Sequence, residues 1–171
     1  TIVIIVICIV LLLTLIGGGV YWYIFVLNAD KNSPEEVLTQ YVSYINEKDF
    51  ESMYTLLSDS TKTRVDKQTY LDRNSNIYNG IEATNVTISD LNYDKENRKL
   101  TYSMSMDTMA GNITFSNKAT FDRQDDNKYY LNWYSQLIFP DLQSDYKVRV
   151  STTQGKRGAI LARDGTALAI T

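Results

Sequence analysis

The spacing of apolar residues changes once in the middle of this chain, near residue 80, and the change limits the folds that it can adopt. From residue 33 to residue 80, apolar side chains recur every three or four positions, the spacing of helices that bury one face. From residue 84 to residue 133 they recur at every second position, the spacing of strands that bury one side. Helices followed by consecutive strands predict an α+β fold, with helices packed on one face of an antiparallel sheet.

Three helices are expected before the strands. The first begins at Ser33, and Glu36 three residues later completes a capping box; this helix ends near Lys48. The second helix covers residues 50–57 and the third covers about residues 66–78. The residues interpreted as breaks in this series are Ser60, Thr61 and Gly80, the last as the C-terminal cap of the third helix.

About four strands are expected in the second half. The alternation slips near Asp90, which predicts a β-bulge, and the polar Asn117 interrupts a later strand. A curved sheet that wraps around a helix would give the domain the shape of a cone. The expected strands are residues 84–93, 100–106, 113–121 and 129–133, joined by turns at 94–97, 110–111 and 125–127.

Residues 2–27 contain no charged side chain. As a helix they would be about 39 Å long, which is enough to cross a hydrocarbon layer of about 30 Å. Tyr21, Trp22 and Tyr23 stand near the end of this run, where aromatic rings favour the headgroup region. The alternative is a cleaved signal peptide, but the run is long for one and no small-residue cleavage site follows. We therefore expect residues 1–27 to be a transmembrane anchor.

The last residues predict a hairpin. Asp164 and Gly165 lie between two short apolar runs, and this pair tolerates the positive φ that a tight turn needs. A two-stranded hairpin is not stable by itself. We therefore expect residues 157–171 to open a module whose body lies beyond Thr171, which would make the chain the front part of a longer protein.

Composition excludes several kinds of chemistry. The chain has no histidine, and its one cysteine, Cys8, lies in the apolar run, so histidine-based nucleophile triads, paired-cysteine zinc sites and disulfides are excluded. The net charge of −3 does not favour a nucleic-acid partner. One S-x-x-K occurs, at residues 144–147, but the segment is expected to be extended, so its serine and lysine would not share a helical face. We expect no catalytic residue, metal site or cofactor in this chain.

The hairpin carries a resemblance to a known family. Residues 157–169 read RG-x-I-x-x-R-D-G-x-x-LA, and this motif resembles the segment that opens the pedestal, or dimerisation, module of class B penicillin-binding proteins. That family usually has Asp where this chain has Ala162, and Asn is common where this chain has Asp164. The matching residues are Arg157, Gly158, Ile160, Arg163, Gly165, Leu168 and Ala169, and Asp164 is counted with them as a family-motif residue.

The residues before the hairpin extend this resemblance. The order of helices and strands is similar to the nuclear-transport-factor-two-like superfamily, and more narrowly to the N-terminal domain of low-affinity class B penicillin-binding proteins. That group contains the methicillin-resistance transpeptidase of staphylococci. The resemblance covers nearly the whole chain and is carried by residues 76–78, 121–123, 131–133 and 137–142, among which Trp133, Phe139 and Pro140 are the family-motif residues.

This resemblance implies a division of the chain and a role. The division is an anchor (1–27), a juxtamembrane linker (28–32), a nuclear-transport-factor-two-like domain (33–143), a second linker (144–156) and the start of the pedestal (157–171). The chain would be a membrane-anchored, non-catalytic spacer or regulatory region. The C-terminal domain would be a serine-type peptidoglycan D,D-transpeptidase that binds β-lactams and contributes to antibiotic resistance.

The same resemblance implies partners and a location. The partners would be the membrane, crossed by a single span, the rest of the same polypeptide, and peptidoglycan or other proteins of cell-wall synthesis. The soluble part would lie outside the cytoplasm. The richness of the chain in Asn, Lys and Tyr indicates a Gram-positive bacterium as its source.

Two other functions stay open. The domain could be a stand-alone extracytoplasmic module that binds a glycan or a protein through exposed tyrosines, with Tyr129, Tyr130 and Tyr134 as candidates. It could also be a small-molecule enzyme with a cavity in the cone, which would need a carboxyl group of raised pKa. The candidate residues for such a cavity are Tyr54, Tyr78, Tyr102 and Asp107.

Overall fold

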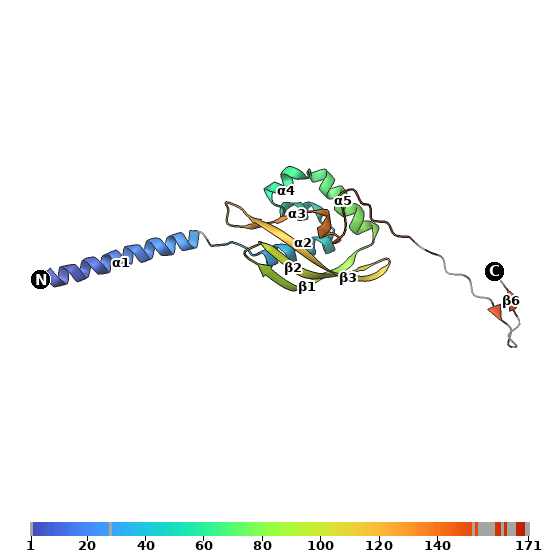
Figure 1. Ribbon diagram of the computed structural model, residues 1–171, viewed down its shortest axis with the longest axis horizontal. Coiled ribbons are helices and arrows are strands. Elements are labelled where there is room, and N and C mark those ends of the chain that lie inside the picture. The colour runs from blue at the N-terminus through green and yellow to red at the C-terminus, as the bar shows by residue number, and fades with distance from the viewer. Residues whose placement is uncertain are drawn as a thin grey trace.

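The structure is a computed structural model that describes residues 2–27, 29–151, 153, 160–161, 163 and 167–169, with side chains described from residue 14 onward except in the two short C-terminal strands. Helix α1 projects from one end of a folded domain, and the chain leaves the domain at the opposite end (Figure 1). The elements of the domain are α2 (Pro34–Glu47), α3 (Phe50–Thr55), α4 (Asp59–Arg64), α5 (Lys67–Gly80), β1 (Thr84–Asp94), β2 (Lys99–Thr108), β3 (Gly111–Arg123), β4 (Tyr129–Asn132) and η1 (Ser135–Leu137).

The predicted α+β architecture is confirmed. The four strands form one antiparallel sheet in the order β1-β2-β3-β4, and the helices lie on one face of it (Figure 1). In β2, Leu100, Tyr102, Met104 and Met106 are buried while the residues between them are half-exposed, as the alternation predicts. Leu38, Tyr41 and Ile45 of α2 are buried on the facing side of the core.

The expectation of three helices in the domain is wrong, because a fourth, α4, covers Asp59–Arg64. Ser58 caps it by accepting a hydrogen bond from the backbone N–H of Thr61 at 3.2 Å. Ser60 and Thr61, expected to break the helical series, therefore lie inside a helix. Thr61 is the one fully buried side chain of this helix, so the helix has no apolar periodicity by which the sequence could reveal it.

The ends of the longer helices agree with the sequence in α2 and differ in α5. At α2, Glu36 N donates to Ser33 Oγ and Ser33 N donates to Glu36 Oε2, which completes the predicted capping box. At α5, Gly80 is the last helical residue and not the cap. The cap is Ile81, and the left-handed residue that turns the chain toward β1 is Glu82, with φ of 53°.

Strand β1, at one edge of the sheet, is irregular. Its register with β2 shifts between Thr84 and Thr87 and again between Ser89 and Asn92, so the predicted bulge near Asp90 is confirmed. Asn85 and Asp90 both have positive φ, of 50° and 54°. At the first shift, the side-chain amide of Asn46 accepts a hydrogen bond from Val86 N and donates one to Val86 O, both at 2.8 Å.

Strand β4, at the other edge, is covered by the chain itself. Leu131 N donates to Leu56 O at 2.9 Å, and Ser58 N donates to Leu131 O at 3.0 Å. The segment that leads into the domain covers the rest, because Asn32 bonds the backbone N–H and C=O of Tyr129 through its side chain.

The two ends of the chain are described less completely. Helix α1 covers Ile2–Leu27, the run expected to be an anchor. Within the described residues, no helix meets the length and hydropathy that a membrane span requires. Near the C-terminus, β5 (Ile160–Leu161) pairs antiparallel with β6 (Ala167–Ala169), while the predicted turn residues Asp164 and Gly165 lie outside the described residues.

Candidate functional site

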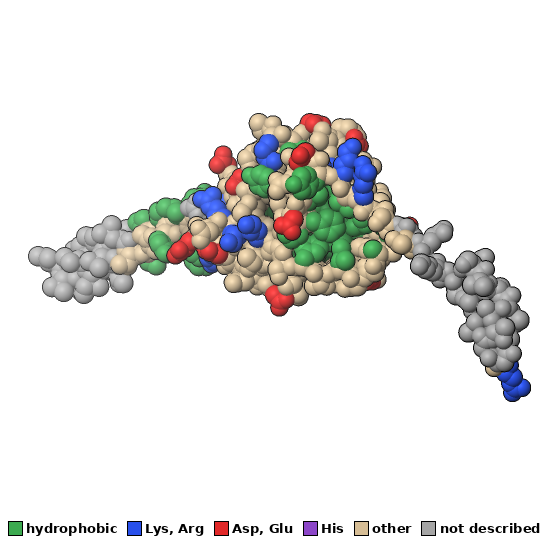
Figure 2. Space-filling model, turned by 45° about the vertical axis from the view of Figure 1, so that its right-hand side comes forward, with side chains coloured by type: hydrophobic (Ala, Val, Ile, Leu, Met, Phe, Trp, Pro, Cys, Tyr) green, Lys and Arg blue, Asp and Glu red, His purple; other side chains and the backbone are tan. Residues whose placement is uncertain are grey.

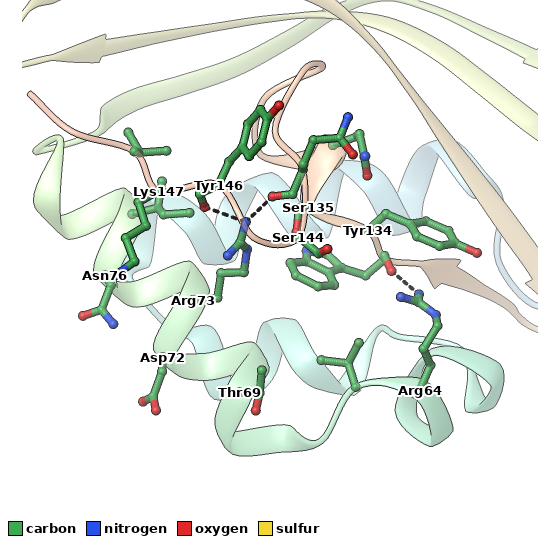
Figure 3. Close-up of a pocket in the computed structure, with 16 residues that line it drawn as sticks. Arg64, Thr69, Asp72, Arg73, Asn76, Tyr134, Ser135, Ser144, Tyr146 and Lys147 are labelled. Carbon is green, nitrogen blue, oxygen red and sulfur yellow. Dashed lines mark hydrogen bonds between the residues drawn. The ribbon is translucent and has the colours of Figure 1, made fainter.

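A groove of about 800 Å³ lies where the chain leaves the domain (Figure 3). One wall is a single face of α5, because Thr69, Arg73 and Asn76 follow at helical spacing. The opposite side is formed by residues 133–136 after β4 and by residues 143–148, which we call the exit segment. Figure 2 shows hydrophobic side chains gathered on the surface of the domain on the side toward this exit.

The inner end of the groove is fixed by Trp133 and Arg64. The Trp133 ring is buried and meets Tyr70 edge-on, with ring centroids 5.0 Å apart. Arg64, in the last turn of α4, donates a hydrogen bond to the backbone carbonyl of Trp133 and stacks over the ring of Tyr134, 4.1 Å from its centroid. The Tyr134 ring is 49% exposed, so this pair presents a partly accessible aromatic surface at the rim.

The outer end is fixed by Arg73 of α5. Its Nη2 donates to the backbone carbonyl of Gln143 at 2.7 Å and to that of Tyr146 at 3.2 Å (Figure 3). Val148, two residues further on, packs against the core. The exit segment is therefore held along α5 by one side chain that bonds two carbonyl groups.

The groove is lined by groups that can recognise a ligand. Arginine side chains, amides and two tyrosines line it, and such groups bind by hydrogen bonding and stacking. Ser144 and Lys147 both line it, but the exit segment is a turn followed by extended chain. This pair therefore lacks the one-turn helical spacing of a transpeptidase nucleophile and its lysine. Among the described residues, no three potential metal ligands gather into one group.

The family-motif residues occupy different environments. Trp133 lies on the groove, Phe139 is half-buried against Phe115 with ring centroids 5.5 Å apart, and Pro140 is exposed. Arg163 is exposed in a turn. Ile160 lies in β5, and Leu168 and Ala169 lie in β6. The remaining motif residues lie outside the described residues: Arg157, Gly158, Asp164 and Gly165.

The structure does not unite the residues proposed for a cavity enzyme. Tyr78 and Tyr102 are in the core, and Tyr54 is half-buried against Tyr70. Asp107 lies on the opposite face of β2 from Tyr102, because five positions along a strand reverse the side-chain direction. Hydrogen bonds from Asn112 and Asn85 lower the pKa of the Asp107 carboxyl, the reverse of the raised pKa that a cavity base would need.

The three tyrosines proposed as a binding patch are likewise separated. Tyr134 lies on the groove, whereas Tyr129 and Tyr130 are half-buried and bond, through their hydroxyl groups, to Asp30 and Asp126. Sequence reasoning also missed Arg64 and Arg73. Both contacts are made to backbone carbonyls about 70 residues away, and no motif signals such contacts.

The comparison with protein families decides what this domain is. The family described as the NTF2-like N-terminal transpeptidase domain matches residues 33–147, which include all the elements from α2 to η1 and nearly the whole groove. The chain belongs to this family. The resemblance of this N-terminal transpeptidase domain to the N-terminal region of class B penicillin-binding proteins is thereby confirmed.

A curated relative agrees with this family. The chain that contains this N-terminal transpeptidase domain is 28% identical, over 148 residues, to penicillin-binding protein 3 of Bacillus subtilis (strain 168). The aligned region covers 81% of this chain and 22% of the relative. The chain therefore spans about a fifth of the length of the penicillin-binding protein that it matches.

Proposed function

We propose that this chain is the membrane-anchored, non-catalytic spacer of a class B penicillin-binding protein. One observation carries the proposal: the chain enters and leaves the transpeptidase N-terminal domain at opposite ends, and each end is fastened to the domain by side chains (Figure 1). A domain that is held at both ends keeps a defined distance between the segment before it and the segment after it.

The fastening at the entry involves residues 30–32. Asp30 pairs with Arg123 at the end of β3 and accepts a hydrogen bond from the Tyr129 hydroxyl. Lys31 N donates to the carbonyl of Asn127 at 2.8 Å, and Asn32 bonds the backbone of Tyr129 twice, at 2.7 Å and 3.1 Å. Asn127 Nδ2 also donates to the carbonyl of Leu27, so the end of α1 and residues 30–32 are both held against the β3–β4 hairpin.

The fastening at the exit is the pair of hydrogen bonds from Arg73 to the exit segment. These contacts support a second linker that begins after Val148, later than the residue 144 expected from the sequence. Beyond it, residues 157–171 would open the pedestal module, with the motif from Arg157 to Ala169 forming its first hairpin.

The anchor and the location complete the proposal. Residues 1–27 would cross the cell membrane once, supported by the uncharged sequence of α1 and its terminal aromatic residues. The domain would then lie outside the cytoplasm. A Gram-positive source is consistent with the Bacillus relative. The partners would be the membrane, the remaining pedestal and D,D-transpeptidase domains of the same polypeptide, and peptidoglycan or cell-wall synthesis proteins.

The first test is the reading frame after Thr171. The proposal expects several hundred further residues that contain S-x-x-K, S-x-N and K-T-G elements. A frame without them would contradict the transpeptidase assignment.

A second test separates a spacer from a catalytic part. In the full-length protein, residues 33–143 are deleted or replaced by an unrelated compact domain of similar end-to-end length. If the domain is a spacer, the rate at which a fluorescent penicillin acylates the purified protein should stay within about twofold of the wild-type rate in both variants. In cells, the variant with the replacement domain should restore peptidoglycan cross-linking, and the deletion variant should not. Loss of acylation in both variants would show that the domain takes part in the chemistry.

The groove favours a second candidate, a module that binds a glycan or a protein. The observation behind it is the exposed Tyr134 ring under Arg64, beside amide and carboxylate side chains. Titration of the chain with soluble muropeptides would change the NMR chemical shifts of Tyr134 and Asn76. The Tyr134→Ala variant would show no such change at Asn76. Shifts spread over the whole surface, or unchanged in that variant, would remove this candidate.

A further inference from the structure

The end of the domain nearest α1 is formed by the turns that follow β1 and β3. Alternate turns of an antiparallel sheet lie at the same end, so residues 95–98 and 124–128 are neighbours, and the turn at 109–110 lies at the opposite end. Tyr93 and Tyr129, which flank the first two turns, meet edge-on with ring centroids 6.3 Å apart. Side chains of both charges gather where α1 meets the domain (Figure 2).

The turn after β3 is bonded to the last residue of α1. Asn127 Nδ2 donates a hydrogen bond to the carbonyl of Leu27, and the carbonyl of Asn127 accepts one from Lys31 N at 2.8 Å. One residue therefore holds the end of the helix through its side chain and the segment after the helix through its backbone. These two bonds fix where the turn lies along the axis of α1.

The bond to Leu27 also places the turn relative to a membrane that α1 would cross. The proposed span ends at Leu27, shortly after the exposed rings of Tyr21, Trp22 and Tyr23, which favour the boundary between hydrocarbon and headgroups. The hydrocarbon core is about 30 Å thick, and the headgroup region adds roughly 5–8 Å on each side. A turn in contact with Leu27 would therefore lie within the headgroup layer.

The charged groups of this turn and of the segment that it holds suit such a layer. Lys31 and Lys128 are exposed, and within the part of the chain that the structure describes neither ammonium group forms a hydrogen bond or a close ion pair. The carboxylates of Asp30 and Asp126 are instead bonded to groups of the domain. Asp125 is an exposed carboxylate, so attraction to a phosphate would come from the two lysines and not from net charge.

We propose that the turn after β3 rests in the headgroup layer of the membrane, where Lys31 and Lys128 bind the phosphate groups of lipids. This inference rests on the proposed membrane span of α1. The lipid contacts would hold the entry end of the domain against the bilayer, so that the domain would not swing on a free tether. The chain that leaves the domain at the opposite end would then do so at a fixed height above the membrane (Figure 1).

A fluorophore on Asp125→Cys in a Cys8→Ser background, the turn label, tests this position. The full chain is reconstituted in vesicles of phosphatidylcholine and phosphatidylglycerol. Lipids that carry a nitroxide on the headgroup should quench the turn label several times more strongly than a label on Ala110→Cys, at the opposite end of the sheet. Equally weak quenching at the two positions would overturn the proposal.

Trp22 reports the membrane span separately, because the other tryptophan, Trp133, is buried in the domain. Lipids brominated in their acyl chains should quench Trp22 if α1 is inserted. Quenching of Trp22 without quenching of the turn label would overturn the headgroup contact and leave the anchor in place. Absence of quenching at Trp22 would overturn the anchor and the headgroup contact together.

Two variants test the contacts themselves. Asn127→Gly keeps the left-handed backbone of residue 127, whose φ is 63°, and removes the side chain that bonds Leu27. Lys31→Gln/Lys128→Gln removes the two ammonium groups. Quenching of the turn label should be weaker in both variants. Asn85→Gly is the matched control, because it makes the same substitution at a φ of 50° at the opposite end of the sheet, and quenching should not change. Unchanged quenching in the lysine variant would overturn the phosphate contact.

Discussion

Asp30 and Arg123 form an ion pair that joins the first residues after α1 to the last residue of β3. The two residues are 93 positions apart in the chain. Both side chains are about one-third to one-half exposed, so the pair contributes little to the free energy of unfolding. We expect the ion pair to help set the direction in which α1 leaves the domain.

Arg123→Gln should loosen the orientation of α1 without unfolding the domain. Spin labels at Val26→Cys and Ser103→Cys, in a Cys8→Ser background, would give a broader distance distribution in this variant. Lys67→Gln is the control, because it breaks an exposed ion pair with Glu51 that is remote in sequence from the entry. Distance distributions of equal width in the wild type and in Arg123→Gln would show that the ion pair does not orient α1.

The same pair predicts a dependence on pH. The hydrogen bond from Arg123 is the main cause that lowers the pKa of Asp30 below 3.8. Because the folded pKa is depressed, the contribution of the pair is complete above the unfolded pKa and is lost as the pH falls through the folded value. The distance distribution should therefore be constant from neutral pH to about pH 5 and should broaden only below about pH 4. Broadening near pH 6 would contradict this assignment.

Arg73→Gln should free the exit segment. The neutral amide cannot bond both carbonyl groups with the strength of a guanidinium, so residues 143–148 would leave α5 more often. Trypsin should then cleave after Lys147 and Arg149 several times faster, as mass spectrometry of timed digests would show. Arg73→Lys keeps the charge and should give an intermediate rate. Cleavage at the wild-type rate in Arg73→Gln would mean that other contacts, such as those of Val148, hold the segment.

Alkaline pH should unfold the domain steeply. Burial raises the pKa of the phenols of Tyr41, Tyr70, Tyr78 and Tyr102, whereas in the unfolded chain they ionise near pH 10. Their contribution to stability is complete below pH 10 and is lost as the pH rises above it. Tyrosinate absorbance and loss of circular dichroism should therefore appear together. Full ionisation of all the tyrosines with unchanged circular dichroism would contradict the burial of these four.

Asn117→Ala should destabilise the domain by about 1–3 kcal/mol, because it leaves buried backbone carbonyl groups unpaired. The Asn117 side chain donates to the carbonyls of Gln136 and Leu137, at 2.8 Å and 3.3 Å, and so fixes η1 on β3. Urea denaturation measures the loss. Asn112→Ala, on the exposed end of the same strand, is the control and should change stability by less than about 0.5 kcal/mol. Equal losses in both variants would show that burial of Asn117 is not the cause.

Much of the fold could be predicted because its determinants are local. The capping box at Ser33 and Glu36, the alternation in β2 and the slip at Asp90 are properties of neighbouring residues, and each corresponds to an observed feature. Helix α4 was missed because it is polar and is stabilised by its cap and by a hydrogen bond from Trp133 N to Thr61 Oγ1, 72 residues away.

The candidate site could not be predicted, because it depends on contacts between distant segments. Nothing near Arg73 in the sequence signals that its partners are the carbonyls of Gln143 and Tyr146. Similarly, the alternation in β2 correctly places Tyr102 in the core, but it does not say what its hydroxyl group meets there. Periodicity predicts which side of an element is buried and leaves the partners undefined.

The irregular edge at β1 would have a consequence if, as proposed, many copies of this domain were anchored side by side in one membrane. Confinement to a plane makes sideways collisions frequent, and a regular exposed strand would let two sheets fuse into one. Here the Asn46 amide occupies both backbone groups of Val86, and the left-handed residues Asn85 and Asp90 break the straight run of donors and acceptors. With β4 covered at the other edge, the sheet offers no regular template for a neighbour, so crowding should not lead to aggregation.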